Sequence, residues 1–469
     1  MTLAVVILAA GKSTRFKSAT PKVLHDFGEK PMIAHSLDLA AQLSDVPPVL
    51  VVGEETDAPL RAWASNRAQF TFQAQRLGTG HAVLQARELL EGNADRVLVL
   101  YGDMPLLRLS SLQRLVAIQQ DRHAAMAMIT IIRENSQGFG RVLRGPQNQV
   151  LRVVEEPEAT PEQLQIRELN AGIYVYDADF LWSHLPRVRP SAEKGEIYLT
   201  DMVELAAGAG LTVADLVLDD PTEAMGINTR VDLADALAVL RQRINEHWML
   251  QGVTLTDPEA TYIGPDVTIG PDTIILPNTH LLGNTTVGAA CQIGPNAWLD
   301  TATIGDRCRV NASIIEHSEM EHDSDIGPLS HLRPGTRVCT GAHIGNFAEL
   351  KKTTLGPGAH QGHFSYLGDA TVGAHVNVAA GTITCNFDGV RKYATIIGDG
   401  AFIGSDTLLI APVEVGEGAK TGAGSVVTHD VPPHTLVYGV PARPRAPSAE
   451  TRQPEVPAPD QASGSKDTE

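Results

Sequence analysis

The C-terminal half of the sequence repeats an aliphatic residue every six positions, from residue 261 to about residue 431. One phase holds Ile263, Ile269, Ile275, Leu281, Val287, Ile293 and Leu299. After a slip in the phase the spacing returns at Ile326, Leu332, Val338, Ile344 and Leu350, and again at Ile397, Ile403, Leu409 and Val415. Helices repeat every 3.6 residues and half-buried strands every two, so neither explains this period. It predicts a parallel β-helix whose short strands each turn one aliphatic side chain inward, with three strands to a coil.

The first 228 residues follow a different pattern. Apolar runs at Leu3–Leu8, Val49–Val52 and Val97–Tyr101 alternate with helical segments, one of them near Met32–Leu43. Near-continuous apolar strands separated by helices predict a mostly parallel, doubly wound α/β sheet that is covered on both faces.

Two further segments complete the expected organisation. A helix over 229–250 carries apolar residues on one face and is expected to link the two halves, ending at Gly252. We therefore expect an α/β domain over 1–228, the linker helix, a β-helix over 251–446, and a tail over 447–469. Because the tail is rich in Pro, Ala, Ser and charge without aliphatic periodicity, it is expected to be disordered.

Composition excludes several classes of partner. The net charge is −18, from 37 basic and 55 acidic residues, which disfavours nucleic acid and anionic membranes. The four cysteines form no CxxC pair and are expected to be reduced and mostly buried. No apolar stretch reaches membrane-spanning length, and the N-terminal apolar run lacks the basic start of a secretory signal. We expect a cytoplasmic protein with small-molecule substrates.

A loop of small and basic residues, Leu8 to Arg15, directly follows the first strand. Such loops let backbone N–H groups approach phosphate at the carboxyl end of a parallel strand. This one is not a Walker A loop, whose first glycine would fall on Val6. It is not a dinucleotide fingerprint either, because Phe16 takes the third glycine position. Seen alone, it is also compatible with a plain surface turn.

Further motifs follow in a fixed order. They are Pro21-Lys22-Val23-Leu24, Gln73, Leu77-Gly78-Thr79-Gly80-His81-Ala82, Tyr101-Gly102-Asp103, Phe139-Gly140, Glu155, Asn170-Ala171-Gly172 and Gly226-Ile227-Asn228. With the first loop they resemble the sugar nucleotidyltransferases (pyrophosphorylases). Joined to a hexapeptide half, they resemble the bacterial family of bifunctional N-acetylglucosamine-1-phosphate uridylyltransferases and glucosamine-1-phosphate N-acetyltransferases. This resemblance implies a left-handed β-helix and a homotrimer whose acetyl-transfer site lies between neighbouring chains.

For the N-terminal half, the resemblance implies UTP as substrate and Mg²⁺ as cofactor. Arg15 and Lys22 would be catalytic and steady the triphosphate, while Asp103 and Asn228 would hold the metal. The UTP and UDP-sugar site would comprise Leu8, Ala9, Ala10, Gly11, Lys22, Gln73, Gly78, Thr79, Tyr101, Gly102, Asp103, Gly140, Glu155, Asn170 and Asn228. A sugar phosphate is already an anion at pH 7, so this reaction needs positioning and charge neutralisation more than a base.

Individually, these residues have simpler interpretations. Asp103 after a strand is compatible with a turn or helix cap, and Asn228 with a cap of the linker helix. Lys22 alone reads as a surface lysine, and Glu155 beside Glu156 as a solvated pair. Only the ordered set indicates a site.

A second group of polar residues interrupts the repeat. It comprises Arg333, Glu349, Lys351, His363, Tyr366, Asn377, Asn386 and Lys392, and Cys385–Ala394 breaks the period, which predicts a projecting loop. Acetylating an amine requires that the amine be unprotonated, and a neutral histidine is suited to accept its proton. A lone histidine on a coil is more often idle, and Arg333 alone could simply stabilise the surface.

Here the resemblance assigns roles as well. His363 would be the catalytic base. Arg333, Lys351, Tyr366, Asn377 and Lys392 would bind glucosamine 1-phosphate, and acetyl-CoA would contact Ala380, Asn386, Phe387, Ser405 and Ala423. Three positions depart from the family pattern: Ser13 replaces a glycine, Arg76 a glutamine and Phe387 a tyrosine.

Together, these observations predict an enzyme that makes UDP-N-acetylglucosamine, a precursor of peptidoglycan and lipopolysaccharide, by acetyl transfer and then uridylyl transfer. One alternative is a pyrophosphorylase whose repeat half only assembles or regulates, although His363, Lys351 and Lys392 argue against it. Another is a non-enzymatic subunit like those of eukaryotic translation initiation exchange factors, which is expected to lack Arg15, Lys22 and Asp103.

Overall fold

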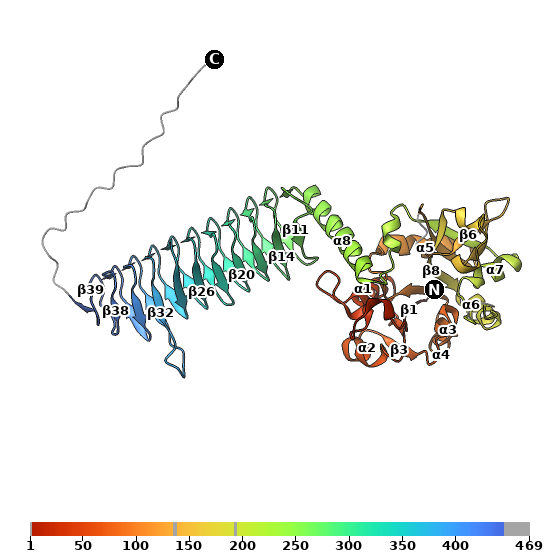
Figure 1. Cartoon of the computed structure of the whole chain (residues 1–469), viewed down its shortest axis with the longest axis horizontal. Coiled ribbons are helices and arrows are strands. Elements are labelled where there is room, and N and C mark those ends of the chain that lie inside the picture. Colours follow the sequence, from red (N-terminus) through yellow and green to blue (C-terminus); the bar gives the residue numbers. More distant parts are fainter. Residues whose placement is uncertain (1, 135–137, 192–194, 445–469) are drawn as a thin grey trace, which may run out of the picture. The chain divides into compact units, whose positions relative to one another are not determined.

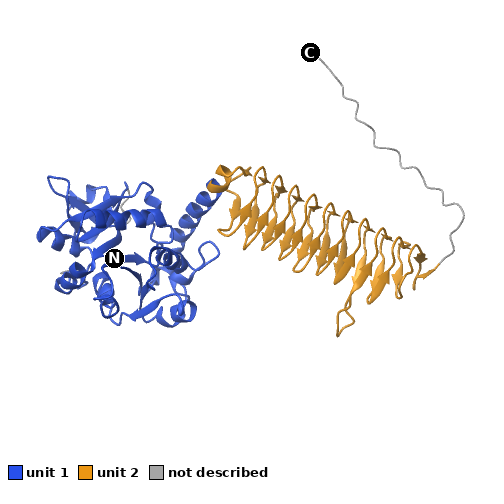
Figure 2. Ribbon diagram, turned by 180° about the vertical axis from the view of Figure 1, so that it is seen from behind, with its two compact units in different colours: residues 1–246 blue, residues 247–469 orange. Residues whose placement is uncertain are grey.

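A computed structural model describes residues 2–134, 138–191 and 195–444 (Figure 1). The chain divides into two compact units, Met1–Glu246 and His247–Glu469 (Figure 2). This division falls inside helix α8 (Arg230–Leu250), so part of the segment expected to be a linker belongs with the first unit. The segment expected to form a disordered tail, 447–469, lies outside the described residues.

Unit 1 is built on a nine-stranded sheet. Its main order is β3 (Gln69–Phe72), β2 (Val49–Val52), β1 (Leu3–Ala9), β4 (Arg96–Tyr101), β8 (Glu168–Asp177), β5 (Met126–Ile132) and β9 (Val213–Val217), with β6 (Arg141–Arg144) and β7 (Val150–Val154) pairing beside β8. Strand β8 runs antiparallel to β4 and β5, and the other neighbours along the main order are parallel. The sheet is therefore mostly parallel, as predicted.

Helices cover both faces of this sheet. One face packs against α1 (Met32–Leu43), α2 (Asp57–Ala64) and α5 (Leu109–Asp121), the other against α3 (Thr79–Leu84), α4 (Arg87–Leu90), α6 (Ala178–His184) and α7 (Asp201–Gly208). Because side chains alternate along a strand, Val5 and Ile7 of β1 enter the first core and Ala4 and Val6 the second. This arrangement confirms the doubly wound α/β class.

Helix α8 begins at a capping box. The Thr229 hydroxyl accepts a hydrogen bond from the Asp232 N–H at 3.2 Å, and the Asp232 carboxylate accepts one from the Thr229 N–H at 2.8 Å. The first turns of the helix pack against a small core of unit 1 through Leu233, Leu237 and Leu240. The helix is followed by Gly252, whose φ of 91° suits only glycine.

Unit 2 is a parallel β-helix with three flat faces. Face 1 is the 12-stranded sheet from β10 (Thr254–Leu255) to β40 (Arg443–Pro444). Face 2 is the 10-stranded sheet from β11 (Thr261–Ile263) to β38 (Val426–Val427). Face 3 is the sheet from β12 (Thr268–Ile269) to β36 (Val413–Val415). The predicted class, a left-handed β-helix of hexapeptide repeats, is confirmed.

The inward aliphatic ladder stabilises these coils. Ile263 pairs with Leu281 and Leu281 with Leu299, and all three side chains are buried. Leu299 then pairs with Ile315 rather than His317, so a shorter coil causes the slip seen in the sequence. Fully burying such a side chain contributes about 1.5–3 kcal/mol.

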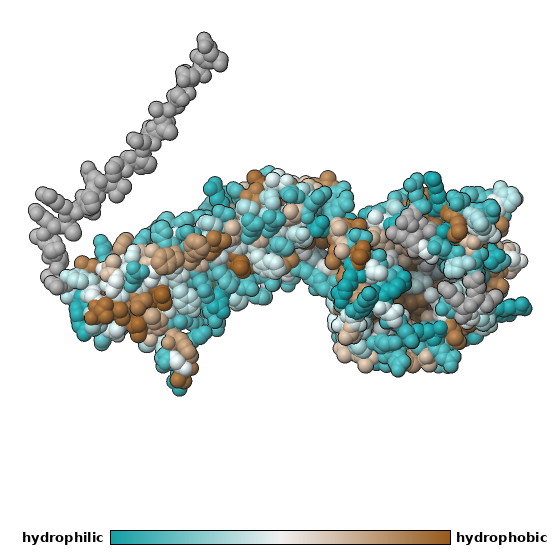
Figure 3. Space-filling model, in the orientation of Figure 1, coloured by the Kyte–Doolittle hydropathy of each residue, from teal (hydrophilic) through white to brown (hydrophobic). Residues whose placement is uncertain are grey.

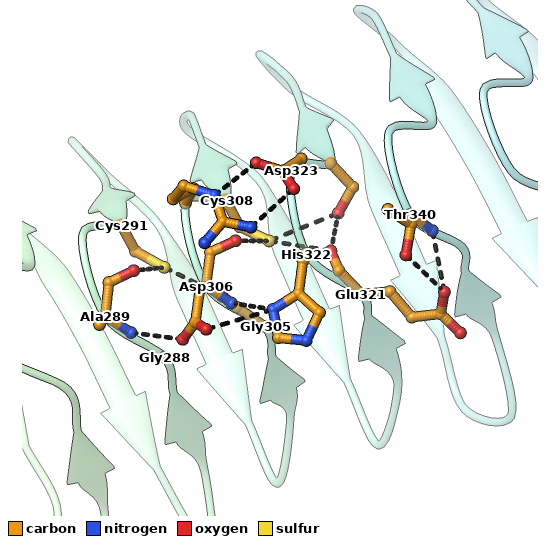
Figure 4. A network of polar contacts seen from close by, with 12 residues as sticks. Gly288, Ala289, Cys291, Gly305, Asp306, Cys308, Glu321, His322, Asp323 and Thr340 are labelled. Carbon is orange, nitrogen blue, oxygen red and sulfur yellow. Dashed lines mark hydrogen bonds and ion pairs between the residues drawn. The ribbon is translucent and has the colours of Figure 1, made fainter.

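Side chains also join successive coils along one outer edge (Figure 4). Asp306 accepts a hydrogen bond from the Ala289 N–H, and His322 accepts one from the Asp306 N–H, both at 2.8 Å. Beneath this ladder the buried thiols of Cys291 and Cys308 each donate to a backbone oxygen of the next coil at 3.0 Å. All four cysteines are free, three of them buried, which confirms the prediction of reduced thiols.

Within the described residues, no helix is long and apolar enough to cross a membrane.

Candidate active sites

A cavity of about 750 Å³ opens in unit 1 near the carboxyl ends of the strands. Its lining includes eight residues predicted from the sequence: Arg15, Thr79, Tyr101, Asp103, Gly140, Glu155, Asn170 and Asn228. These residues come from elements spread over the whole unit. They meet because the ends of β4 and β7 and the segment before α8 lie at this edge of the sheet. The other predicted residues, Leu8, Ala9, Ala10, Gly11, Lys22, Gln73, Gly78 and Gly102, lie outside this lining.

Lys22 joins the two residues predicted to bind the metal. Its ammonium, nearly buried in the short 3₁₀ turn Lys22–Leu24, donates to the Asp103 carboxylate at 2.7 Å and to the Asn228 side-chain oxygen at 3.2 Å. Arg15 donates to the same Asn228 oxygen at 3.0 Å. The two oxygens therefore converge on one cation already.

This donor set fits Mg²⁺. The ion prefers hard oxygen ligands, and proteins usually hold it through one or two carboxylates together with substrate phosphates. Asp103 supplies a carboxylate and Asn228 an amide oxygen, and both face the cavity. No group of three or more His, Cys, Asp or Glu side chains that could hold a metal occurs in the described part of the chain, so phosphate oxygens would complete the set.

The loops after β1 and β3 lie close together beside this cavity. The buried Gln73 side chain donates to the Gly78 carbonyl at 3.1 Å. Arg76 donates to the Ala10 carbonyl at 2.9 Å and pairs with Glu55. The side chains of Gln73 and Arg76 thus hold the backbone of these two loops in place, and a nucleotide base that binds here would contact that backbone.

Where Glu155, Asn170 and Thr200 line this end of the cavity, their polar groups are already engaged. Thr200 donates to the Glu155 carboxylate at 2.9 Å, and Asn170 donates to the Tyr174 hydroxyl at 2.7 Å. Burial, followed by the carboxylates of Asp103 and Glu155, raises the pKa of Tyr101, which keeps its phenol neutral. Thr200 and Tyr174 are site residues that no sequence motif indicated, since neither belongs to a recognisable pattern.

Asp201 lies next to this end of the cavity and gives a stability prediction. Burial, then the charges of Glu158 and Glu204, raises its pKa from 3.8 to about 6. A raised carboxyl pKa stabilises the fold at low pH, and that stability is lost as pH rises from about 4 to 6.

We therefore expect Asp201→Asn to stabilise unit 1 above pH 6. Because Asp201 is partly exposed, the gain is discounted to about 1 kcal/mol. It should be constant above pH 6 and should shrink towards pH 4. Melting temperatures from pH 4 to 8 measure it, with Asp235→Asn as an exposed control. An equal effect of both substitutions at every pH would contradict the expectation.

In unit 2 the predicted residues separate onto two edges of face 2. Strand β29 (Ser365–Gly368) runs across this face between them. The edge shared with face 1, termed the histidine edge, carries His363, Ala380, Ser405 and Ala423 in successive coils. The edge shared with face 3, termed the lysine edge, carries Arg333, Lys351, Asn386 and Lys392. Tyr366 lies on face 2 between them, and Asn377 on face 1.

Cations gather at the lysine edge. Arg333 ends strand β23 (His331–Arg333), pairs in register with Lys351 of β26 (Ala348–Lys351), and donates to Glu349 at 2.9 Å. Lys392 lies on the loop after β32 (Ile383–Cys385), which projects from the coil as predicted (Figure 1). The Lys392 ammonium, then the Arg333 guanidinium, lowers the pKa of Lys351. The lowered pKa shows that these cations repel one another, a repulsion that a bound anion would relieve.

Apolar side chains gather beside the histidine edge. His363 is exposed there, beside a hollow of about 450 Å³ lined by Phe347, Phe364, Ser365, Tyr366, Gly381, Ile383, Asp406 and Leu408. Phe347 and Phe364 are more than half exposed, and hydrophobic residues gather over the coils that carry β32 and β38 (Figure 3). The six-residue period did not indicate these two phenylalanines, because it identifies inward positions and not corner residues.

Comparison with known proteins covers both units. The model of a MobA-like NTP transferase domain matches residues 5–151, and that of the bacterial transferase hexapeptide (six repeats) matches residues 266–301 and 394–429. A bifunctional protein GlmU from Pelobacter propionicus is 46% identical over 436 residues, which cover 92% of this chain and 95% of that protein. The chain belongs to the GlmU family of bifunctional proteins. Proteins of the same name from Trichlorobacter lovleyi, 43% identical with 92% and 95% coverage, and Koribacter versatilis, 44% identical with 93% and 94% coverage, agree.

Membership in the GlmU family confirms the prediction of an enzyme with two transferase halves: a nucleotidyltransferase in unit 1 and a hexapeptide acyltransferase in unit 2.

The three positions that depart from the family pattern have distinct surroundings. Ser13 has φ 57°, a left-handed conformation in which serine costs roughly 1–2 kcal/mol relative to glycine. Arg76 holds the Ala10 carbonyl, as described, and Phe387 is exposed on the projecting loop.

Proposed function

We propose that this chain makes UDP-N-acetylglucosamine at two separate sites. Unit 2 transfers the acetyl group of acetyl-CoA to the amine of glucosamine 1-phosphate. Unit 1 then transfers uridylyl from UTP to the N-acetylglucosamine 1-phosphate, which releases pyrophosphate. The observation that carries the proposal is that Lys22 binds the oxygens of Asp103 and Asn228, two residues that line the cavity of unit 1. The same chain also presents a histidine and three cations on a β-helix.

In unit 1, the sugar phosphate attacks the α-phosphorus of UTP. Arg15 and Lys22 neutralise charge on the triphosphate, and the backbone of the loop after Leu8 contributes N–H donors. Gln73, Gly78 and Thr79 position the uracil, while Gly140, Glu155 and Asn170 bind the N-acetyl sugar. Mg²⁺, held by Asp103 and Asn228, would neutralise phosphate charge when bound.

In unit 2, the amine nitrogen attacks the thioester carbonyl. The neutral imidazole of His363 accepts the proton that the nitrogen loses. When the C–S bond breaks, the imidazolium returns this proton to the leaving thiolate, and coenzyme A departs as the thiol. Arg333, Lys351 and Lys392 bind the phosphate, with Tyr366 and Asn377 positioning the sugar. Ala380, Asn386, Phe387, Ser405 and Ala423 contact acetyl-CoA.

The two edges of face 2 support a homotrimer. Within one chain, His363 and Lys351 lie on opposite edges, and the four residues of β29 extend about 13 Å at 3.3 Å per residue. A phosphate at one edge does not place the amine of the same small sugar beside the histidine at the other. A neighbouring chain that turns its opposite edge towards the first completes the site, and the apolar residues around Phe347 and Phe364 lie where it would pack.

Sedimentation equilibrium tests this arrangement. We expect about 150 kDa, three times the chain mass of 50.1 kDa. Co-expression of His363→Ala with Lys351→Ala should regain part of the acetyl transfer that each variant lacks, because mixed trimers contain some intact sites. A single-chain mass, or no regained activity in mixed assemblies, would refute it.

The direct test of the proposed function is an assay of both half-reactions on the purified chain. Radiolabelled acetyl-CoA with glucosamine 1-phosphate reports acetyl transfer, and pyrophosphate release from UTP and N-acetylglucosamine 1-phosphate reports uridylyl transfer. Uridylyl transfer alone would favour a pyrophosphorylase whose repeat half only assembles, and neither activity would favour a binding subunit. In keeping with the expectation from the sequence, we also propose a cytoplasmic location.

A further inference from the structure

The coil that carries His363 has a polar residue in its core. Gln361 of β28 (His360–Gln361) pairs in register with Ile344 of the preceding coil and Val378 of the next, so it occupies an inward aliphatic position. Its side chain is completely buried. Burying an amide is costly unless its polar atoms are hydrogen-bonded, so an aliphatic residue would serve the core better.

The amide of Gln361 begins a short chain of hydrogen bonds that ends at His363. Its Nε2 donates to the Ser365 hydroxyl at 2.7 Å, and that hydroxyl donates to the backbone carbonyl of His363 at 2.9 Å. Gln361 and Ser365 are both buried. The other amide atom, Oε1, makes no hydrogen bond within the described part of the chain. Oε1 is thus left unpaired, while Nε2 holds the Ser365 hydroxyl in place at this corner of the coil.

The corner at residues 362–364 is hydrogen-bonded differently from the equivalent corners of the next coils. In the next three coils the hydroxyl at the position of Ser365 donates to the carbonyl three residues before it: Thr382 to Ala379 at 2.8 Å, Thr407 to Gly404 at 2.6 Å and Ser425 to Gly422 at 2.6 Å. Ser365 instead bonds the carbonyl two residues before it, that of His363.

The backbone angles differ too. The adjoining corners each contain a left-handed residue, at Phe347, Gly381 and Asp406, with φ of 59°, 75° and 56°. None of residues 362–364, all of which are described, has a positive φ. The corner that presents His363 therefore lacks the turn geometry of its neighbours and is held by the Gln361–Ser365 pair instead.

We infer that Gln361 and Ser365 are positioning residues for acetyl transfer. By fixing the His363 carbonyl from inside the coil, they set the direction in which the exposed imidazole points. Proton transfer in an amine attack depends on the alignment of the base, and small misplacements reduce the rate strongly. This inference rests on the proposed role of His363 as the base.

Gln361→Met tests the inference, because methionine keeps the volume and matches the apolar neighbours. We expect kcat for acetyl transfer to fall about tenfold, while KM for acetyl-CoA and for glucosamine 1-phosphate changes less than about twofold. The melting temperature should stay equal or rise, since the unpaired oxygen is removed. Ser365→Ala should lower kcat similarly, whereas Ser365→Thr, which keeps the hydroxyl, should retain most of it. Uridylyl transfer in the same proteins is the internal control.

Full kcat in both Gln361→Met and Ser365→Ala would overturn the inference. So would a loss of kcat in Gln361→Met that is matched by a lower melting temperature, or an equal loss of uridylyl transfer in either variant, because such a result means a purely structural role. Ser365→Ala is judged by its kcat alone, since it leaves the buried Gln361 Nε2 without its acceptor and is expected to melt earlier. His363→Ala separates the two hypotheses. If it keeps acetyl transfer, the proposed role of His363 fails; if it loses acetyl transfer while the other variants keep it, only the positioning role fails.

Discussion

Asp103→Ala should abolish uridylyl transfer almost completely and leave acetyl transfer intact. The substitution removes the carboxylate that contacts Lys22 and that would hold Mg²⁺ together with Asn228. Removing one preorganised group that stabilises transition-state charge costs about 10²–10³-fold in kcat, and the loss here should reach that range. Pyrophosphate release from UTP and N-acetylglucosamine 1-phosphate at saturating Mg²⁺ measures it.

The two-unit chain supplies its own control. Acetyl transfer by Asp103→Ala should match the unsubstituted protein, since Asp103 belongs to unit 1 and the histidine and lysine edges to unit 2. Asp57→Ala, which removes a carboxylate that pairs with Arg61 on the surface of α2, should keep both activities. Retention of full uridylyl transfer by Asp103→Ala would exclude Asp103 from the site.

His363→Ala should have the opposite effect. Loss of a general base typically costs about 10²–10⁴-fold, so acetyl transfer should fall to that extent while uridylyl transfer is unchanged. At high pH, where more of the amine is already unprotonated, the deficit should shrink. A pH series of acetyl-transfer rates for both proteins measures this.

His360→Ala is the matched control, because His360 is an exposed histidine of the same coil that lies on face 1. It should keep both activities. If the two histidine variants lose acetyl transfer equally, the loss reflects damage to the coil and His363 is not the base.

Sequence patterns predicted the fold well because the hydrophobic residues of each unit follow a regular pattern along the chain. The six-residue period places Leu281 and Leu299 in the core, and the apolar run of β1 feeds both faces of the sheet. The motifs also singled out Asp103 and Asn228, which are far apart in the chain. In the structure both side chains accept hydrogen bonds from the Lys22 ammonium. The boundaries of the domains and the roles of the individual site residues stay predictions.

Sequence patterns could not predict several features of the sites, and each has a physical reason. The period marks inward positions but does not show which outer edge a corner residue occupies, so the separation of His363 from Lys351 could not be foreseen. Thr200 and Tyr174 reach the cavity through tertiary contacts that leave no local motif. Gln361 breaks the aliphatic ladder in a single coil, and only its hydrogen bonds reveal why.

Mixing the two inactive variants tests most directly whether one chain carries two independent sites. Asp103→Ala and His363→Ala are purified separately and each is supplied with glucosamine 1-phosphate, acetyl-CoA, UTP and Mg²⁺. Neither alone should form UDP-N-acetylglucosamine at an appreciable rate, whereas their mixture should, because the acetylated sugar phosphate diffuses from one protein to the other. A mixture that forms none, although each variant still performs its own half-reaction, would contradict the account.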